Sequence, residues 1–175
     1  MFKKVFAVFA LLLFLTGCAR AQTLQDAPII FSSGHWIVKS IPNDTTPSSP
    51  MVCVGIFNDS TTAVQASHDT LYIDTSPWGG VTSIAVKFWS RDVVFTREAS
   101  IIEQRSGIIV FGDASYRELL HSSGLRMLIF TPQKRIGRLQ ILLDGFADVN
   151  DFMHVSTKCP HTHTSNATQG TVIGA

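Results

Sequence analysis

The sequence predicts a mostly β protein, an antiparallel β-sandwich or barrel of about seven to eight strands with two short helices. Two observations predict this class. Short alternating or continuous apolar runs recur along the chain, and turn-forming residues separate them at hairpin distances. Two segments change to helical spacing, but no long crossover helix of the kind that joins parallel strands lies between the apolar runs.

Residues 1–17 have the features of a signal peptide. Lys3 and Lys4 form a positively charged start, and residues 5–15 are an apolar run of eleven residues, well short of a membrane span. We therefore expect an exported chain, with residues 1–17 removed and residues 18–30 serving as a tether. Residues 31–159 are expected to form a single β-rich domain.

Two processing sites overlap where this signal ends. The segment "LTGC", residues 15–18, resembles the lipobox of bacterial lipoproteins, in which the cysteine is lipidated and becomes the first residue. The segment "ARA", residues 19–21, fits an ordinary signal peptidase and would release a soluble chain. The lipobox is favoured because it directly follows the apolar run. We expect a lipid anchor at Cys18, and Ala19 after it indicates the outer membrane.

The charge of the processed chain is close to neutral. Removal of Lys3 and Lys4 leaves 12 basic against 13 acidic residues. This balance gives no electrostatic reason to expect nucleic acid or an anionic membrane surface as a partner. Contact with a membrane is expected only through the anchor at Cys18.

The remaining cysteines, Cys53 and Cys159, form an even pair whether Cys18 is lipidated or removed. An exported chain meets an oxidising compartment, where two cysteines in one domain usually pair. We predict a disulfide between Cys53 and Cys159. It would close a loop of about 100 residues and contribute up to roughly 4 to 5 kcal/mol on the chain-entropy model.

The first half of the predicted domain contains four strands. They are "HWIVKS" (35–40), then "MVCVGIF" (51–57) after a proline-rich loop, "TLYIDTS" (70–76) and "VTSIAVKFW" (81–89). The continuous run at 51–57 fits a strand covered on both faces. The turn sequence "PWGG" (77–80) predicts that the last two strands form a hairpin.

The second half predicts further strand pairs and two helices. "ASIIEQ" and "IIVF" (99–111) are expected as strand, tight turn and strand, and "LRMLIFT" and "GRLQILLD" (125–144) as another pair. Residues 114–123 have helical spacing, with Asp113 as a cap and Gly124 as a stop. After Gly145 a short amphipathic helix follows, whose apolar side contains Phe146, Val149 and Met153.

Few residues carry recognisable chemistry. Ser67, His68 and Asp69 are adjacent, but neighbours in an extended segment point to opposite faces, so they predict a polar turn rather than a catalytic triad. The sequence contains no Gly-x-Ser-x-Gly elbow. We therefore expect no enzymatic activity and no cofactor.

The C-terminal segment, residues 160–175, contains no large apolar residue before Val172 and is expected to be a disordered tail. Within it, His161 and His163 are weak candidates for binding copper or zinc. A structural zinc site needs four ligands, and a disulfide would remove Cys159 from any such set. A solvated polar tail is the simpler interpretation.

Three segments resemble a known family. "GHWIVKS" is followed by the predicted strand with a cysteine, "YRELLHSSGLRMLIF" resembles a helix that leads into a strand, and "GRLQILLDGFADVNDFM" looks like a final strand that runs into a helix. In this order they are similar to the invasion-associated locus B family of exported bacterial proteins. The resemblance implies a small, mostly β, disulfide-bearing envelope protein without known enzymatic activity. Members of that family commonly carry a cysteine where this chain has Ser40.

These observations together predict a non-enzymatic, exported envelope protein that binds an envelope or host-facing macromolecule. Two alternatives remain open. One is a periplasmic metal carrier that uses His161 and His163. The other is an accessory lipoprotein of a secretion or conjugation apparatus.

Overall fold

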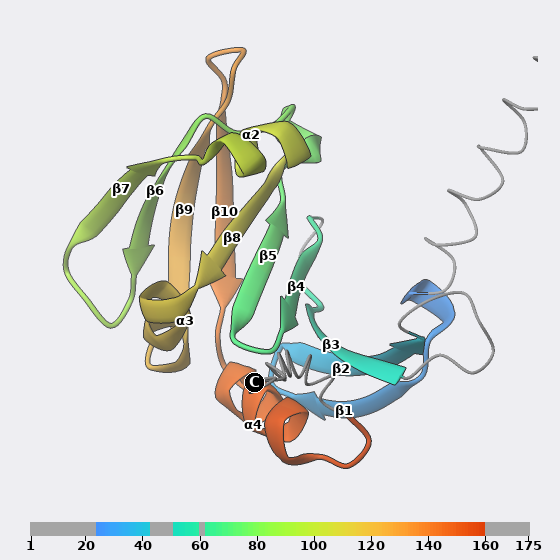
Figure 1. Cartoon of the computed structure of the whole chain (residues 1–175). Coiled ribbons are helices and arrows are strands. Elements are labelled where there is room, and N and C mark those ends of the chain that lie inside the picture. The colour runs from blue at the N-terminus through green and yellow to red at the C-terminus, as the bar shows by residue number, and fades with distance from the viewer. Residues whose placement is uncertain (1–23, 43–50, 60–61, 160–175) are drawn as a thin grey trace, which may run out of the picture.

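The computed structural model describes residues 24–42, 51–59 and 62–159 (Figure 1). Within these ranges ten strands form two antiparallel sheets, one of six strands and one of four. This arrangement confirms the predicted class, as two open sheets rather than a closed barrel. The strands outnumber the expected seven or eight because several short ones are not evident from the sequence.

The six-stranded sheet has the order β1-β2-β3-β4-β5-β8. Pairing between β3 and β4 is short, with Gly55 opposite Ala66 and Ile56 opposite Gln65. Figure 1 shows that β1, β2 and β3 run at a steep angle to β4 and β5. The strands are β1 (Ile29–Ser33), β2 (Trp36–Pro42), β3 (Met51–Phe57), β4 (Val64–Ser67), β5 (Thr70–Asp74) and β8 (Ile108–Gly112).

The four-stranded sheet has the order β10-β9-β6-β7. Its strands are β6 (Ser83–Phe88), β7 (Val94–Glu98), β9 (Gly124–Phe130) and β10 (Ile136–Leu142). The predicted pair of strands at 125–144 is confirmed as β9 and β10, with Leu139 opposite Met127 and Ile141 opposite Leu125. The outermost strands are β1 and β8 in the six-stranded sheet and β10 and β7 in the four-stranded sheet.

Two helices confirm the predicted ones. They are α3 (Asp113–Leu120), which packs on β5 and β8, and α4 (Phe146–Val155), which packs on β1, β2 and β3. The predicted ends of α3 are wrong, because its N-cap is Gly112 rather than Asp113, it ends at Leu120, and Gly124 begins β9. A 3-10 turn, η1 (Ser76–Trp78), and a short helix, α2 (Ile101–Ser106), complete the named elements. In the part of the chain that the structure describes, every helix is too short or too polar to cross a bilayer.

The start of α4 depends on Gly145. Its φ of 81° lies in the left-handed region, which glycine adopts without steric cost. A methyl group at this position would also lie 2.1 Å from the carbonyl oxygen of Ser33 in β1. Glycine therefore lets α4 begin directly against β1. The predicted apolar side of α4, Phe146, Val149 and Met153, is buried.

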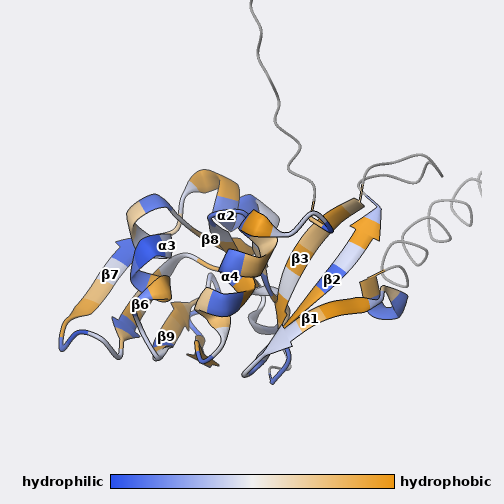
Figure 2. Cartoon of the chain, turned by 90° about the horizontal axis from the view of Figure 1, so that it is seen from below, coloured by the Kyte–Doolittle hydropathy of each residue, from blue (hydrophilic) through white to orange (hydrophobic). Residues whose placement is uncertain are grey.

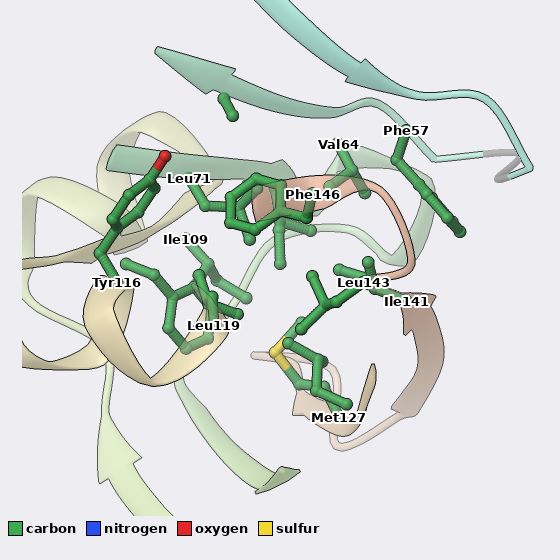
Figure 3. Packing of buried hydrophobic residues seen from close by; sticks show 14 of the residues in the cluster. Phe57, Val64, Leu71, Ile109, Tyr116, Leu119, Met127, Ile141, Leu143 and Phe146 are labelled. Carbon is green, nitrogen blue, oxygen red and sulfur yellow. The ribbon is translucent and has the colours of Figure 1, made fainter. Parts of the chain in front are cut away.

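The core lies between the two sheets and beneath α3 and α4. Figure 3 shows Phe146 of α4 beside Leu71 and Val64 of the six-stranded sheet. The ring of Phe146 lies 4.6 Å from that of Trp36 and 5.6 Å from that of Tyr116. The four-stranded sheet contributes a matching inner row, Ile84, Val86, Leu125, Met127, Ile129 and Ile141. Helix and sheet therefore share one apolar interior.

The predicted hairpin between residues 70–76 and 81–89 is wrong. The strand β5 pairs with β4 and β8, whereas β6 pairs with β7 and β9 in the other sheet. The true hairpin partner of β5 is the short strand β4, joined to it by a turn in which Asp69 has a φ of 56°. The "PWGG" segment instead contains η1 and carries the chain from one sheet to the other, with Gly79 in the left-handed conformation.

The strand predicted at 99–104 is also wrong, because residues 101–106 form α2. The hydroxyl of Ser100 accepts from the backbone N–H of Glu103, 3.2 Å away, and the Glu103 carboxylate accepts from the backbone N–H of Ser100, 2.7 Å away. This reciprocal capping box satisfies two donors at the helix start. Local capping therefore prevails over the β propensity of Ile101 and Ile102.

Three smaller differences concern strand limits. The strand β1 begins at Ile29, inside the expected tether of residues 18–30. The strand β3 is buried on one face and only half-buried on the other, so it is not covered on both sides as predicted. The strand β7 forms a hairpin with β6, and the sequence patterns do not predict this strand.

Candidate functional site

The predicted disulfide between Cys53 and Cys159 is present, with a Cα–Cα distance of 5.3 Å. Both residues are buried, and the bond joins β3 to the segment that follows α4. Ser40 lies directly opposite Cys53 in the pairing of β2 and β3. Because the bond joins β3 to the residues after α4, the disulfide holds α4 against the six-stranded sheet.

The remaining predicted site residues lie outside the described part of the chain. They are the lipidation residue Cys18 and the weak metal candidates His161 and His163. The signal peptide of residues 1–17 and the tail of residues 160–175 lie outside it as well. Among the described residues no group of three or more histidine, cysteine, aspartate or glutamate side chains is placed to hold a metal ion.

The adjacent residues Ser67, His68 and Asp69 lie at the end of β4 and in the turn before β5. The ring of His68 contacts the ring of His154 in α4, with centroids 5.3 Å apart, and His154 Nε2 lies 3.4 Å from Asp69 Oδ1. Ser67 lies on the outer face of the strand, because its neighbour Ala66 is on the buried face. The turn thus contacts α4, as a polar turn is expected to do.

A buried hydrogen bond lies beneath this turn. The hydroxyl of Tyr116 in α3 donates to Asn150 Oδ1 in α4 over 2.8 Å. Burial, followed by the nearby charge of Asp69, raises the pKa of Tyr116, so its hydroxyl stays protonated. His154 Nδ1 lies 2.9 Å from the carbonyl oxygen of Asn150. These contacts join α3, α4 and the β4–β5 turn and have an evident structural role.

The outer edge of β8 is covered by two charged side chains. The backbone N–H of Val110 donates to Glu103 Oε1 over 2.9 Å, and Arg97 Nη2 donates to the carbonyl oxygen of Val110 over 3.2 Å. Arg97 and Glu103 also form a two-point ion pair, with N–O distances of 2.7 and 2.6 Å. A strand from another molecule could not pair there without displacing them.

Glu103 is buried in this arrangement. Burial raises the pKa of its carboxyl group, but the hydrogen bonds from Arg97, Val110 and Ser100 together outweigh that effect and lower the pKa to about 2. The carboxylate is therefore charged at neutral pH. It guards the edge of β8 and caps α2 with the same two oxygens.

The outer edge of β7 is different. No other strand of the described chain pairs with its free side. The exposed fractions of Val93, Val94 and Phe95 are 69%, 56% and 49%. Figure 2 shows hydrophobic colour on part of β7 as well as on α2. An exposed apolar edge strand is a template for pairing with another chain, so β7 is the candidate interaction site.

This site does not follow from the sequence patterns alone, although the sequence contains a signal for the strand. The segment 93–96 combines β-branched and aromatic residues, which favour a strand. Its exposure could not be predicted because it depends on the position of β7 at the end of the sheet order.

Comparison of the chain with family models, with curated proteins and with solved structures finds no match.

Proposed function

We propose that this chain is an exported envelope lipoprotein that binds a protein partner and catalyses no reaction of its own. The partner contributes an extended segment that adds to the free edge of β7 and continues the four-stranded sheet. In this mode the backbone hydrogen bonds give affinity, and the side chains on alternate positions give specificity.

The contrast between two of the edge strands, β7 and β8, carries the proposal. Both β7 and β8 end a sheet, and charged side chains hold both backbone groups of Val110 in β8. On β7, Arg97 Nη1 donates to the carbonyl oxygen of Glu98 over 3.1 Å, which leaves residues 94–96 as the open part of the edge. Natural sheet proteins blunt an exposed edge with charges, prolines or covering elements. An edge left open, with apolar residues at 93–95, is consistent with a strand that is kept available for a partner.

Export and anchoring rest on the sequence. The signal segment of residues 1–17 and the lipobox ending at Cys18 support an anchored chain. The disulfide between Cys53 and Cys159 is consistent with an oxidising compartment. The resemblance to the invasion-associated locus B family supports the same location and a non-enzymatic role.

Site-directed photo-crosslinking in intact cells tests partner binding. A photoreactive residue is placed at Val94 on the free edge and, in a control, at Val155, an apolar position at the end of α4 that is more exposed than Val94. We expect a discrete adduct from position 94 that is absent from position 155 and lost when Thr96→Pro is added. Equal adducts from both positions, or an adduct that survives Thr96→Pro, would contradict strand addition at β7.

The intact mass of the mature protein tests the anchor. We expect a chain that begins at Cys18 with the added mass of a lipid, and a Cys18→Ala variant without it. A mature chain that begins at Gln22 would show that the protein is released in soluble form.

A further inference from the structure

The outer face of the four-stranded sheet gathers cations and an exposed tryptophan. The cations are Lys87, Arg126 and Arg138, on the neighbouring strands β6, β9 and β10. Residues paired across these strands share a face, and the alternate residues of the same strands form the core. Trp89 follows Lys87 on this outer side and is 42% exposed. A nearly neutral chain therefore concentrates positive charge on one sheet face.

Arg126 is held in a defined orientation. The indole of Trp89 lies on Gly124, where a methyl group would be 2.9 Å from Trp89 Cε3. The guanidinium carbon of Arg126 lies 6.0 Å from the centre of the Trp89 ring, within the range of a cation–π contact. Arg126 Nε donates to Gln140 Oε1 on the next strand over 3.3 Å. The guanidinium is thus arranged in advance for an oxyanion.

The charges on this face are not balanced within the chain. Lys87 lies directly opposite Arg126, and like charges at such positions destabilise a sheet. The Nζ of Lys87 donates to Asp92 Oδ1 over 2.7 Å, which neutralises one cation. Glu98 lies at the other end of the face, in the row that contains Ser83 and Phe130. The region of Arg126 and Arg138 therefore remains positive.

Apolar side chains lie among these cations. Leu128 is directly opposite Arg138, and Ile136 is the next residue of β10 on the same face, two positions before Arg138. Both are exposed. Tryptophan, arginine and apolar residues are typical of protein interfaces, whereas a charged glycan offers little apolar surface to Leu128 and Ile136. Val94 of β7 lies directly opposite Lys87, so the free edge and the cationic face are continuous.

We propose that the outer face of the four-stranded sheet docks an acidic surface of a protein partner, with Arg126 and Arg138 contacting its carboxylates. This inference rests on the proposed function and specifies the chemistry of the partner. Complementary charge accelerates the encounter and fixes its orientation, while the β7 edge supplies backbone pairing.

A binding assay with defined polymers tests the acidic partner. The mature protein is titrated with a copolymer of glutamate and tyrosine, a copolymer of lysine and tyrosine, and dextran sulfate. The readout is tryptophan fluorescence, since Trp36 is buried and Trp89 is exposed. We expect the glutamate copolymer to bind, with an affinity that falls as salt is added, and the lysine copolymer not to bind.

Matched variants locate the binding face. Replacing Arg126 and Arg138 with glutamine should weaken binding of the glutamate copolymer about tenfold at low salt, which two exposed ion pairs can account for. The control replaces Arg105 and Arg117 with glutamine. Both lie on helices away from this face, and the change in net charge is the same.

The outcomes separate this inference from the proposed function. Tighter binding of dextran sulfate, lost in the same variant, would overturn the assignment to an acidic protein. No binding, or equal weakening in the control, would overturn the cationic site itself. If the crosslink from position 94 then persists in the Arg126→Gln and Arg138→Gln variant, strand addition at β7 stands without the acidic partner.

Discussion

The strands β7 and β8 end their sheets on the same side of the molecule, but their edges are treated in opposite ways. Arg97 extends from β7 and, with Glu103 of α2, occupies the backbone groups of Val110 in β8. The exposed residues 93–96, the last three of which belong to β7, include no charged side chain. Arg97 of β7 therefore helps to block the edge of β8, while the edge of its own strand stays open at residues 94–96.

Because of this difference, residues at the β8 edge are expected to affect stability, and residues at the nearby β7 edge are expected to affect binding. Glu103 links a helix cap, an ion pair and a strand edge, so its loss affects three contacts at once. The side chains of Val93 and Val94 project largely into solvent, so they contribute little to the fold. We expect substitutions on the β8 side to change folding and substitutions on the β7 side to change association.

The largest effect is expected for Glu103→Ala. The substitution leaves Arg97 without its partner and the Val110 N–H without its acceptor, which should cost about 3 to 5 kcal/mol of unfolding free energy. Urea denaturation measures the change. Glu98→Ala, which removes an exposed carboxylate from β7, should stay within about 0.5 kcal/mol. Similar losses in the two variants would contradict a guarded β8 edge.

The same carboxylate predicts a pH dependence. Its pKa falls from 4.5 to about 2 on folding, so the folded state favours the charged form. The resulting stabilisation is complete above about pH 4.5, decreases as the pH falls and is lost below about pH 2; it amounts to at most about 3 kcal/mol. Denaturation of the native chain and of Glu103→Gln between pH 5 and 2 should show a shallower slope for the variant. Parallel slopes would contradict the lowered pKa.

Proline substitutions distinguish the two sides of β7. Ala99 N–H donates to the carbonyl oxygen of Thr82, and hydrogen-bonded pairs alternate along an antiparallel ladder. The N–H of Phe95 should therefore point to β6 and that of Thr96 to the free edge. Phe95→Pro should cost about 3 kcal/mol or more and Thr96→Pro less than about 1 kcal/mol. Phe95→Ala controls for the lost ring, and denaturation in which Thr96→Pro is the more harmful would reverse the assignment.

Local patterns predicted the fold class, the disulfide, α3, α4 and the pairing of β9 with β10, because each depends on periodicity or on cysteine count. They failed where two local preferences compete. The Ser100–Glu103 capping box was readable in the sequence, yet the run of Ile101 and Ile102 favoured a strand. The hairpin partner of β5 could not be predicted from the sequence. The turns on both sides of β5 permit a hairpin, and only tertiary packing selects β4.

Local sequence patterns could not predict the β7 edge or the cationic face for a related reason. An edge exists only once the order of strands in a sheet is fixed, and that order depends on contacts between distant segments. The cationic face likewise combines Lys87, Arg126 and Arg138 from three strands. The net charge of the chain is close to zero and therefore gives no indication of this cationic face.

The smallest effect on stability, and the most direct test of the open edge, is expected for Val94→Lys. The side chain is 56% exposed, so the unfolding free energy should change by no more than about 0.5 kcal/mol. A lysine on an edge strand opposes pairing with another chain, so the crosslink from a photoreactive residue placed at the neighbouring Val93 and heat-induced light scattering should both decrease. Val110→Lys is the matched change on β8, where Arg97 and Glu103 already block pairing. It should leave both readouts unchanged, and an equal decrease there would mean that the two edges do not differ in their availability to a partner.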